Sequence, residues 1–264
     1  IMNGGGHSIL IPNPRDIAGL IKEWNIHRPT ITTGLNTLFN GILNHPDFPK
    51  MDCSRLKITS AGGMAMQKAV AERWQKETGC QVTEGYGMTE ASPVITCNPV
   101  TSGMRIGTIG MPVPSTDVRI VDDAGNVLGG GPENVGEIQA KGPQVMKGYW
   151  QRPEATAEVI KDGWLATGDM GFMHPDGFFQ IVDRKKDMIL VSGFNVYPNE
   201  IEDVIAMHPK VLEVVAIGIP DEKSGEVPKV FIVKKDASLT VEEVLDHCRS
   251  NLTGYKMPRK VEFR

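Results

Sequence analysis

The sequence predicts a mixed fold, part α/β and part α+β, divided into three units. Up to about Gly107, short apolar strands alternate with helices that carry an apolar stripe, a pattern typical of α/β domains. Beyond it, short alternating strands follow one another through tight turns, and an α+β unit begins after Lys186. The predicted units are 1–107, 108–185 and 186–264. A chain of 264 residues, 40% of them apolar, is long enough for two or more compact cores.

Two helices are predicted near the start of the chain. Residues 15–28 place apolar side chains at helical spacing, and Pro29 ends the helix because it has no backbone N–H. The apolar positions are Ile17, Leu20, Ile21 and Trp24. Residues 31–43 begin extended and then turn helical until His45-Pro46.

A strand, a glycine turn and a third helix are expected next. Residues 56–60 form a short apolar strand that leads into the turn Ala61-Gly62-Gly63. The third helix ends at Gly79, and its stripe is expected to be core rather than a substrate contact. The stripe consists of Met66, Ala69, Val70 and Trp74.

The second unit is predicted to be a small β-barrel-like subdomain. Residues 116–128 and 135–142 alternate apolar and polar side chains, as half-buried strands do. Asp176-Gly177 is typical of a hairpin turn and is assigned no function.

The third unit mixes strands with two capped helices. Asn199 followed by Glu202 predicts a capping box at the start of one helix, and Thr240 followed by Glu243 predicts another. The face of the second helix expected to be apolar carries Val241, Val244, Leu245, Cys248 and Leu252. Strands are expected at 188–192, 211–219 and 229–235.

Composition excludes several classes of function. A net charge of −4 gives no electrostatic reason to expect nucleic acid as a partner. The four cysteines have no metal-ligand or redox spacing, which favours reduced thiols in the cytoplasm. No apolar run reaches the ~20 residues of a membrane-spanning helix, so any membrane contact is expected to be peripheral. No nucleophile elbow supports a hydrolase, and the six histidines lack partners at catalytic spacing.

Two segments carry the chemistry. Residues 162–186, DGWLATGDMGFMHPDGFFQIVDRKK, place Asp169 in a glycine turn, where its carboxylate can accept hydrogen bonds from a vicinal diol. Arg184 supplies a planar donor fork, and the two lysines after it can meet the remaining charge of a nucleotide. The second segment is EGYGMTE, residues 84–90.

These segments resemble motifs of the AMP-forming acyl-CoA synthetases in the adenylate-forming superfamily, most of all the bacterial long-chain fatty-acid–CoA ligases. Residues 86–90 match the family's Tyr-Gly-x-Thr-Glu motif, and residues 164–169 match its Trp-x-x-Thr-Gly-Asp motif. Residues 183–202 match the linker and the start of its mobile C-terminal domain. The resemblance implies the end of a large N-terminal domain followed by a small α+β lid. It also implies activation of a fatty acid with ATP to acyl-AMP, then transfer of the acyl group to coenzyme A.

The resemblance also implies roles for individual residues. Glu90 would bind Mg²⁺, Thr89 would contact the α-phosphate and Tyr86 the adenine face, while Asp169 and Arg184 would bind the ribose. The nucleotide-binding set also includes Gly85, Gly87 and Ile181. Each segment has an ordinary alternative: YGMTE can be a strand-ending turn, and Asp169 and Arg184 can be a solvated turn residue and a surface side chain.

Three further groups follow from the same resemblance. Lys186 would be the hinge about which the lid rotates, although a charged linker has the same composition. The CoA-binding loop would be Ser192, Gly193 and Phe194, continuing into Asn195, and the acyl and carboxylate pocket would use Ala61, Gly62 and Gly63. Ordinary turns between elements are the competing interpretation of both glycine segments.

The match predicts that the chain is a fragment. Residues 1–83 contain no Ser/Thr/Gly-rich phosphate loop, and the chain stops at Arg264, before the family's terminal lysine. We therefore expect no acyl-CoA synthesis by the isolated chain, and measured turnover would contradict this. A homodimer and a peripheral contact with the inner membrane face are further hypotheses.

Two rival functions stay open at this stage. A sibling activity, such as a medium-chain or aryl-acid CoA ligase or a domain that loads a carrier protein, would share these motifs. A non-catalytic nucleotide- or acyl-binding module would keep them without the phosphate loop.

Overall fold

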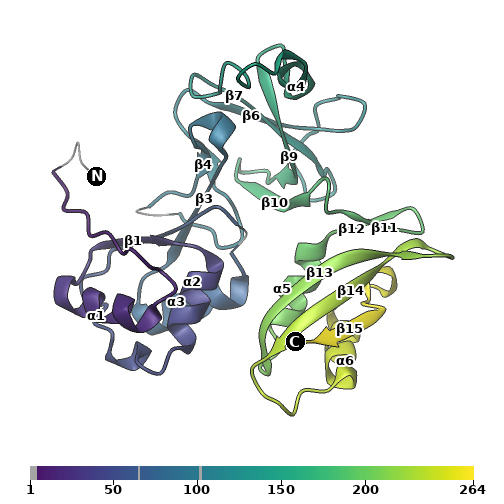
Figure 1. Cartoon of the computed structure of the whole chain (residues 1–264). Coiled ribbons are helices and arrows are strands. Elements are labelled where there is room, and N and C mark those ends of the chain that lie inside the picture. The colour runs from purple at the N-terminus through teal and green to yellow at the C-terminus, as the bar shows by residue number, and fades with distance from the viewer. Residues whose placement is uncertain (1–4, 65, 101–102) are drawn as a thin grey trace.

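The described residues form three sheets with helices packed on them (Figure 1). The structure is a computed structural model that describes residues 5–64, 66–100 and 103–264. None of the helices in these ranges is long and apolar enough to cross a membrane. The mixed α/β and α+β class predicted from the sequence is confirmed.

The first sheet has the strand order β1-β2-β3-β4-β5. Its strands are β1 (Ile31–Gly34), β2 (Ile58–Ala61), β3 (Val82–Gly87), β4 (Val94–Cys97) and β5 (Met111–Pro112). The helices beside it are α1 (Ile17–His27), α2 (Asn36–Asn44) and α3 (Lys68–Thr78), with 3-10 turns η2 (Phe48–Lys50) and η3 (Thr89–Ala91). Strands β1 to β3 run parallel, whereas β4 and β5 are antiparallel. Carboxyl ends of the parallel strands therefore meet at one edge, where EGYGMTE begins.

The predicted elements of this unit are confirmed, with three differences. Strand β2 continues through Ala61, which the sequence placed in the following turn. Met66 precedes α3, although it is buried in the same core as Val70 and Trp74. Strand β5 pairs with β4, so the first sheet reaches into the range predicted for the second unit.

The second sheet is antiparallel, in the order β10-β9-β7-β6, with β8 paired to β9. Its elements are β6 (Asp117–Val121), β7 (Gly136–Lys141), α4 (Pro153–Val159), β8 (Ile160–Lys161), β9 (Trp164–Met173) and β10 (Phe179–Arg184). The Asp176-Gly177 hairpin turn is confirmed, since the N–H of Gly177 donates to the carbonyl of His174. One core joins this sheet to the first: Ile95 of β4 is buried with Ile138 and Leu165.

The third sheet has the order β12-β11-β14-β13, with β15 parallel to β14. Its elements are β11 (Ile189–Val191), β12 (Phe194–Val196), α5 (Pro198–Ala206), β13 (Val211–Asp221), β14 (Gly225–Lys234), α6 (Val241–Asn251), η4 (Gly254–Lys256) and β15 (Lys260–Phe263). Helix α5 lies on the side of this sheet that faces the other two (Figure 1). The side chain of Asn40 in α2 donates to the carbonyl of Leu212 at 3.0 Å, which ties the third unit to the first.

Only one of the two predicted capping boxes is present. Thr240 and Glu243 cap α6 as expected. Asn199 does not cap α5, because that helix already begins at Pro198, whose fixed φ suits the first helical position. Glu202 instead accepts a hydrogen bond from the N–H of Ala216 at 2.9 Å. Val241 is also 41% exposed, whereas Val244 and Cys248 of the predicted face are buried.

Candidate functional site

A cleft of about 1490 Å³ lies where the three sheets meet. Residues from β2, β3, β9, β10 and α5 line it, so it is built from segments far apart in sequence. The predicted site residues that line it are Ala61, Gly63, Gly85, Tyr86, Gly87, Asp169, Ile181, Arg184 and Lys186. The fold thus brings most of the predicted nucleotide residues to one place.

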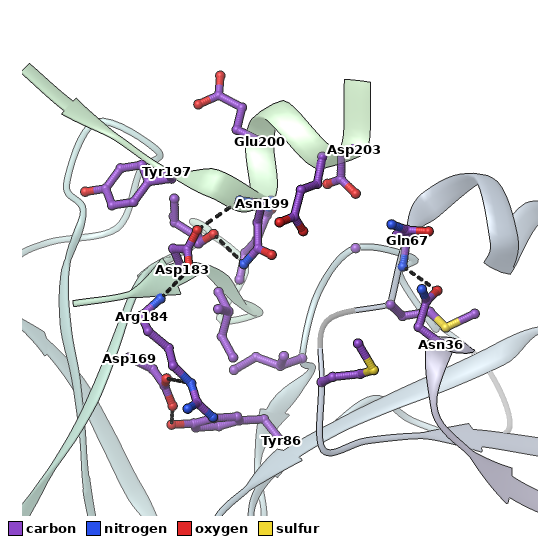
Figure 2. A pocket seen from close by; sticks show the side chains of 18 of the residues that line it. Asn36, Gln67, Tyr86, Asp169, Asp183, Arg184, Tyr197, Asn199, Glu200 and Asp203 are labelled. Carbon is purple, nitrogen blue, oxygen red and sulfur yellow. Dashed lines mark hydrogen bonds and ion pairs between the residues drawn. The ribbon is translucent and has the colours of Figure 1, made fainter. Parts of the chain in front are cut away.

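Tyr86, Asp169 and Arg184 form a connected group in this cleft (Figure 2). The hydroxyl of Tyr86 donates to Oδ2 of Asp169 at 2.5 Å. Nε of Arg184 lies 3.6 Å from Oδ1 of the same carboxylate. Strand pairing explains the second contact, because Asp169 of β9 is directly opposite Arg184 of β10. Burial, with help from the Asp169 carboxylate, raises the pKa of Tyr86, so its hydroxyl stays a donor.

Thr89 and Glu90 lie beside the cleft rather than in its lining. Gly87 lies just before this segment. Only glycine fits there, because the backbone passes against the carbonyl of Pro93 and leaves no room for a Cβ. Oε1 of Glu90 accepts a hydrogen bond from the hydroxyl of Tyr149 at 2.8 Å, and its backbone carbonyl accepts from Met146 N–H at 2.7 Å. Glu90 is therefore held in place from the second unit.

A metal ion would find few protein ligands here. In the described ranges, no three or more His, Cys, Asp or Glu side chains are grouped so as to hold one. Mg²⁺ usually takes only one or two carboxylates and completes its shell with phosphate oxygens and water. A single carboxylate such as that of Glu90 would fit this pattern for a metal that arrives with a nucleotide.

The backbone just before the predicted hinge is anchored to the second sheet. The N–H of Lys185 donates to the carbonyl of Gly168 at 2.9 Å, and its ammonium pairs with Asp123 at 2.8 Å. Lys186 is exposed, and its side chain makes no hydrogen bond or ion pair within the described part of the chain. Strand β10 ends at Arg184, and the anchored residue Lys185 lies next to the predicted hinge position.

Ser192, Gly193 and Phe194 of the predicted CoA loop do not line the cleft in this conformation. Ser192 and Gly193 form the left-handed turn between β11 and β12, with φ of 51° and 84°. Phe194 is 55% exposed and stacks on Tyr255 with ring centroids 4.8 Å apart. Among the other predicted residues, Asn195 lines the cleft and Gly62 does not.

Several carboxyl residues that were not predicted as site residues also line the cleft, among them Glu84, Asp183 and Asp203. Glu84 could have been found, because in a strand it shares a face with Tyr86 two residues later. Oε1 of Glu84 accepts from Gly107 N–H at 3.1 Å. Asp183 and Asp203 gave no comparable signal, since their surroundings come from elements distant in sequence.

Glu84 should make the stability of the fold depend on pH. Burial raises the pKa of its carboxyl from 4.5 to about 7, and Asp203 adds to this while hydrogen bonds from Gly107 and Met66 oppose it. Between these pH values the folded chain binds a proton that the unfolded chain has lost. The contribution of Glu84 to the free energy of unfolding is thus fully present below pH 4.5 and lost as the pH rises through about 7.

Glu84→Gln should remove this contribution, because the amide does not ionise. Plotted against pH, the free energy of unfolding from urea titrations should fall less steeply for the variant, by at most roughly 1.4 kcal/mol per pH unit. Glu77→Gln, an exposed site on α3, should keep the wild-type slope. Equal slopes for Glu84→Gln and the wild type between pH 4.5 and 7 would contradict the assignment.

Known proteins are similar to nearly the whole of this chain. A long-chain-fatty-acid–CoA ligase of Yersinia pestis is 60% identical over 260 residues, which are 98% of this chain and 46% of the relative. The ligase of that name from Bacillus subtilis is 43% identical over 98% of this chain and 46% of its own length. A feruloyl-CoA synthase from an Amycolatopsis species is 38% identical over 98% of this chain and 52% of its own length. The chain spans about half the length of these relatives.

Solved structures agree with the fold. The anthranilate CoA ligase AuaEII in complex with anthranoyl-AMP superposes with a TM-score of 0.92 at 29% identity, covering 98% of this chain and 51% of that one. ATP-bound MatB from Rhodopseudomonas palustris gives a TM-score of 0.87 at 34% identity, covering 97% and 50%.

Family models match two stretches of the sequence. The model described as AMP-binding enzyme covers residues 1–150, more than half of the chain, and the AMP-binding enzyme C-terminal domain covers residues 200–264. The motif segment that begins at Glu84 lies within the first match, and α6 lies within the second. On these matches, the chain belongs to the AMP-binding enzyme family.

Proposed function

We propose that the protein carrying this chain is an AMP-forming long-chain fatty-acid–CoA ligase. It would join a fatty acid to AMP with release of pyrophosphate, and then transfer the acyl group to the thiol of coenzyme A with release of AMP. The observation that supports this most is the Tyr86–Asp169–Arg184 group in the cleft. Its position in a chain 60% identical to a ligase of that name favours the long-chain activity.

The nucleotide would bind where these three side chains meet. Asp169 would accept hydrogen bonds from both ribose hydroxyls, because a carboxylate offers acceptors to two donors at once. Arg184 would donate to the same ribose, and the ring of Tyr86 would contact the adenine. Gly85, Gly87 and Ile181 line the same cleft.

Phosphate binding is proposed for the segment after Tyr86. The hydroxyl of Thr89 would donate to the α-phosphate. Glu90, positioned by Tyr149, would hold a Mg²⁺ ion that neutralises phosphate charge. Charge builds up at phosphorus and at the acyl carbon, so positioned donors and cations would dominate catalysis.

The remaining site proposals concern the acyl chain and coenzyme A. Ala61, Gly62 and Gly63 would form the floor beside the acyl carboxylate, and Gly63 has a left-handed φ of 82°. Ser192 to Phe194 would bind coenzyme A after the third unit rotates about Lys186, since they lie outside the cleft in the present conformation. The domain division at 1–107, 108–185 and 186–264 belongs to this proposal. The proposal also includes a cytoplasmic location, a peripheral contact with the inner membrane face, and a homodimer.

Consumption of coenzyme A with ATP tests the proposed reaction. The full-length protein that carries this chain should consume coenzyme A with long-chain fatty acids, and more slowly with short or aromatic acids. The 264-residue chain, assayed beside it, serves as the test of the fragment prediction.

An aryl-acid CoA ligase is the second candidate. It is favoured by the 38% identity to a feruloyl-CoA synthase and by the superposition on an anthranilate CoA ligase. Turnover confined to aromatic acids would select it. Nucleotide binding with no turnover on any acid would instead select a non-catalytic binding module.

The variant Tyr86→Phe tests the role of the Tyr86 hydroxyl separately from that of the ring. The variant keeps the proposed adenine contact and loses the hydrogen bond to Asp169. Without that bond we expect the KM for ATP to rise about 3- to 10-fold, the usual effect of one lost hydrogen bond. The KM for the fatty acid, measured in the same assays, should not change. An unaltered KM for ATP would mean that the hydroxyl does not orient Asp169 for the nucleotide.

A further inference from the structure

Asp183 links the two sides of the predicted hinge. It lies in β10, before Lys186, and is only 5% exposed. Its Oδ2 accepts a hydrogen bond at 2.9 Å from the backbone N–H of Asn199, which lies beyond the hinge in α5. The side chain of Asn199 in turn donates to the carbonyl of Val182 at 3.2 Å. We call Val182, Asp183 and Asn199 the cross-hinge clasp.

The clasp takes the place of the missing cap of α5. No side chain at the N-cap position, Tyr197, accepts from the first turn of this helix. The first N–H groups of a helix need acceptors, and its N-terminus favours a negative charge. From β10, on the other side of the hinge, Asp183 provides both the acceptor and the negative charge. If the third unit rotates, α5 loses its cap and Asp183 loses a partner.

The clasp also reaches the proposed nucleotide site. Oδ1 of Asp183 accepts from the backbone N–H of Arg184 at 2.7 Å. The guanidinium of Arg184 faces Asp169, which is held by Tyr86. Figure 2 shows this continuous path from Tyr86 to the start of α5. One buried carboxylate therefore contacts both the backbone of Arg184 and the first turn of α5 in the third unit.

We propose that Asp183 is a positioning residue that holds the third unit in the orientation seen here and couples that orientation to the Asp169–Arg184 pair. The coupling to a nucleotide rests on the proposed function. The clasp itself rests only on the contacts across the hinge.

Trypsin can report on the clasp directly. Arg184, Lys185 and Lys186 are exposed trypsin sites at the hinge, and cleavage there requires the strand end to detach locally. In the full-length protein, Asp183→Asn should speed cleavage after these residues roughly tenfold, as expected when a charge-assisted hydrogen bond is lost. Asp183→Ala should have at least this effect. Mass spectrometry of the hinge peptides gives the rates.

Two comparisons separate the clasp from a general loss of stability. Asp117→Asn makes the same change at an exposed position of the same sheet and should leave the hinge rate unchanged. Cleavage after Lys76 in α3 serves as an internal reference, because general unfolding would speed it as well. Asn199→Ala removes only the bond to Val182 and should give a smaller increase at the hinge.

AMP tests the coupling. AMP should slow cleavage at the hinge in the wild type. In Asp183→Asn the slowing factor should be at least threefold smaller, when AMP is added at a concentration that calorimetry shows to saturate the variant. Equal protection would overturn the coupling. If AMP does not bind the wild type, the proposed nucleotide site fails, while the rates without AMP still decide the clasp. A folded Asp183→Ala variant cleaved at the hinge at the wild-type rate would overturn the clasp.

Discussion

Replacing Asp169 by asparagine is expected to weaken AMP binding about 30- to 150-fold, because charge-assisted hydrogen bonds contribute roughly 2–3 kcal/mol. The substitution keeps the size of the side chain but removes its charge and one acceptor. It would therefore take away the proposed hydrogen bond to one ribose hydroxyl, together with the attraction to Arg184, whose Nε lies 3.6 Å from the carboxylate. Isothermal titration calorimetry with AMP measures the loss, and the KM for ATP should rise in parallel.

Asp176→Asn is the matched control for this experiment. Asp176 lies in the hairpin turn that follows β9 and pairs with Arg105 at the surface, with 57% of its side chain exposed. Surface ion pairs contribute little, so AMP affinity should stay within about twofold of the wild type. The ribose-binding role of Asp169 is wrong if its variant binds AMP as tightly as this control does.

Replacing Trp74 by alanine should destabilise the first unit by about 3–5 kcal/mol, the usual cost of deleting a buried tryptophan. Trp74 is 0% exposed, and its ring centroid lies 4.8 Å from that of Phe39. Its indole N–H donates to Oγ1 of Thr59 at 3.0 Å, so truncation also removes a buried hydrogen bond. Urea denaturation followed by circular dichroism measures the loss.

Trp150→Ala makes the same change at a site where the side chain is 88% exposed. Surface substitutions of this kind usually alter stability by less than about 0.5 kcal/mol. Both variants replace one tryptophan by alanine, so the difference between their urea unfolding midpoints reports the effect of burying the side chain. Similar midpoints would contradict the placement of Trp74 in the core.

The helices of the first unit could be predicted because their signals are local. Apolar spacing identified α1, and the positive φ of Gly79 ends α3 as its sequence suggested. The capping box predicted at Thr240 is confirmed for the same reason, since Thr240 and Glu243 lie within one helical turn. The box at Asn199 failed because the acceptor at α5 is Asp183, 16 residues upstream.

Some residues of the candidate site could likewise be predicted from local sequence, and others could not. Tyr86, Asp169 and Arg184 could be chosen from short motifs and from the family resemblance. The clasp role of Asp183 could not, because it depends on Asn199 in another unit. Strand registers, such as Asp169 opposite Arg184, bring residues of the site together.

By itself, the sequence determined the fold class, most helices and strands, and the residues that identify the family. Each of these depends on side-chain chemistry and spacing within a few turns or strands. Only the tertiary structure decided that Tyr86 donates to Asp169, that Asp183 caps α5, and that Ser192 to Phe194 lie away from the cleft. Hydrogen bonds act over about 3 Å, and the packing of whole sheets, which local spacing does not specify, sets those distances.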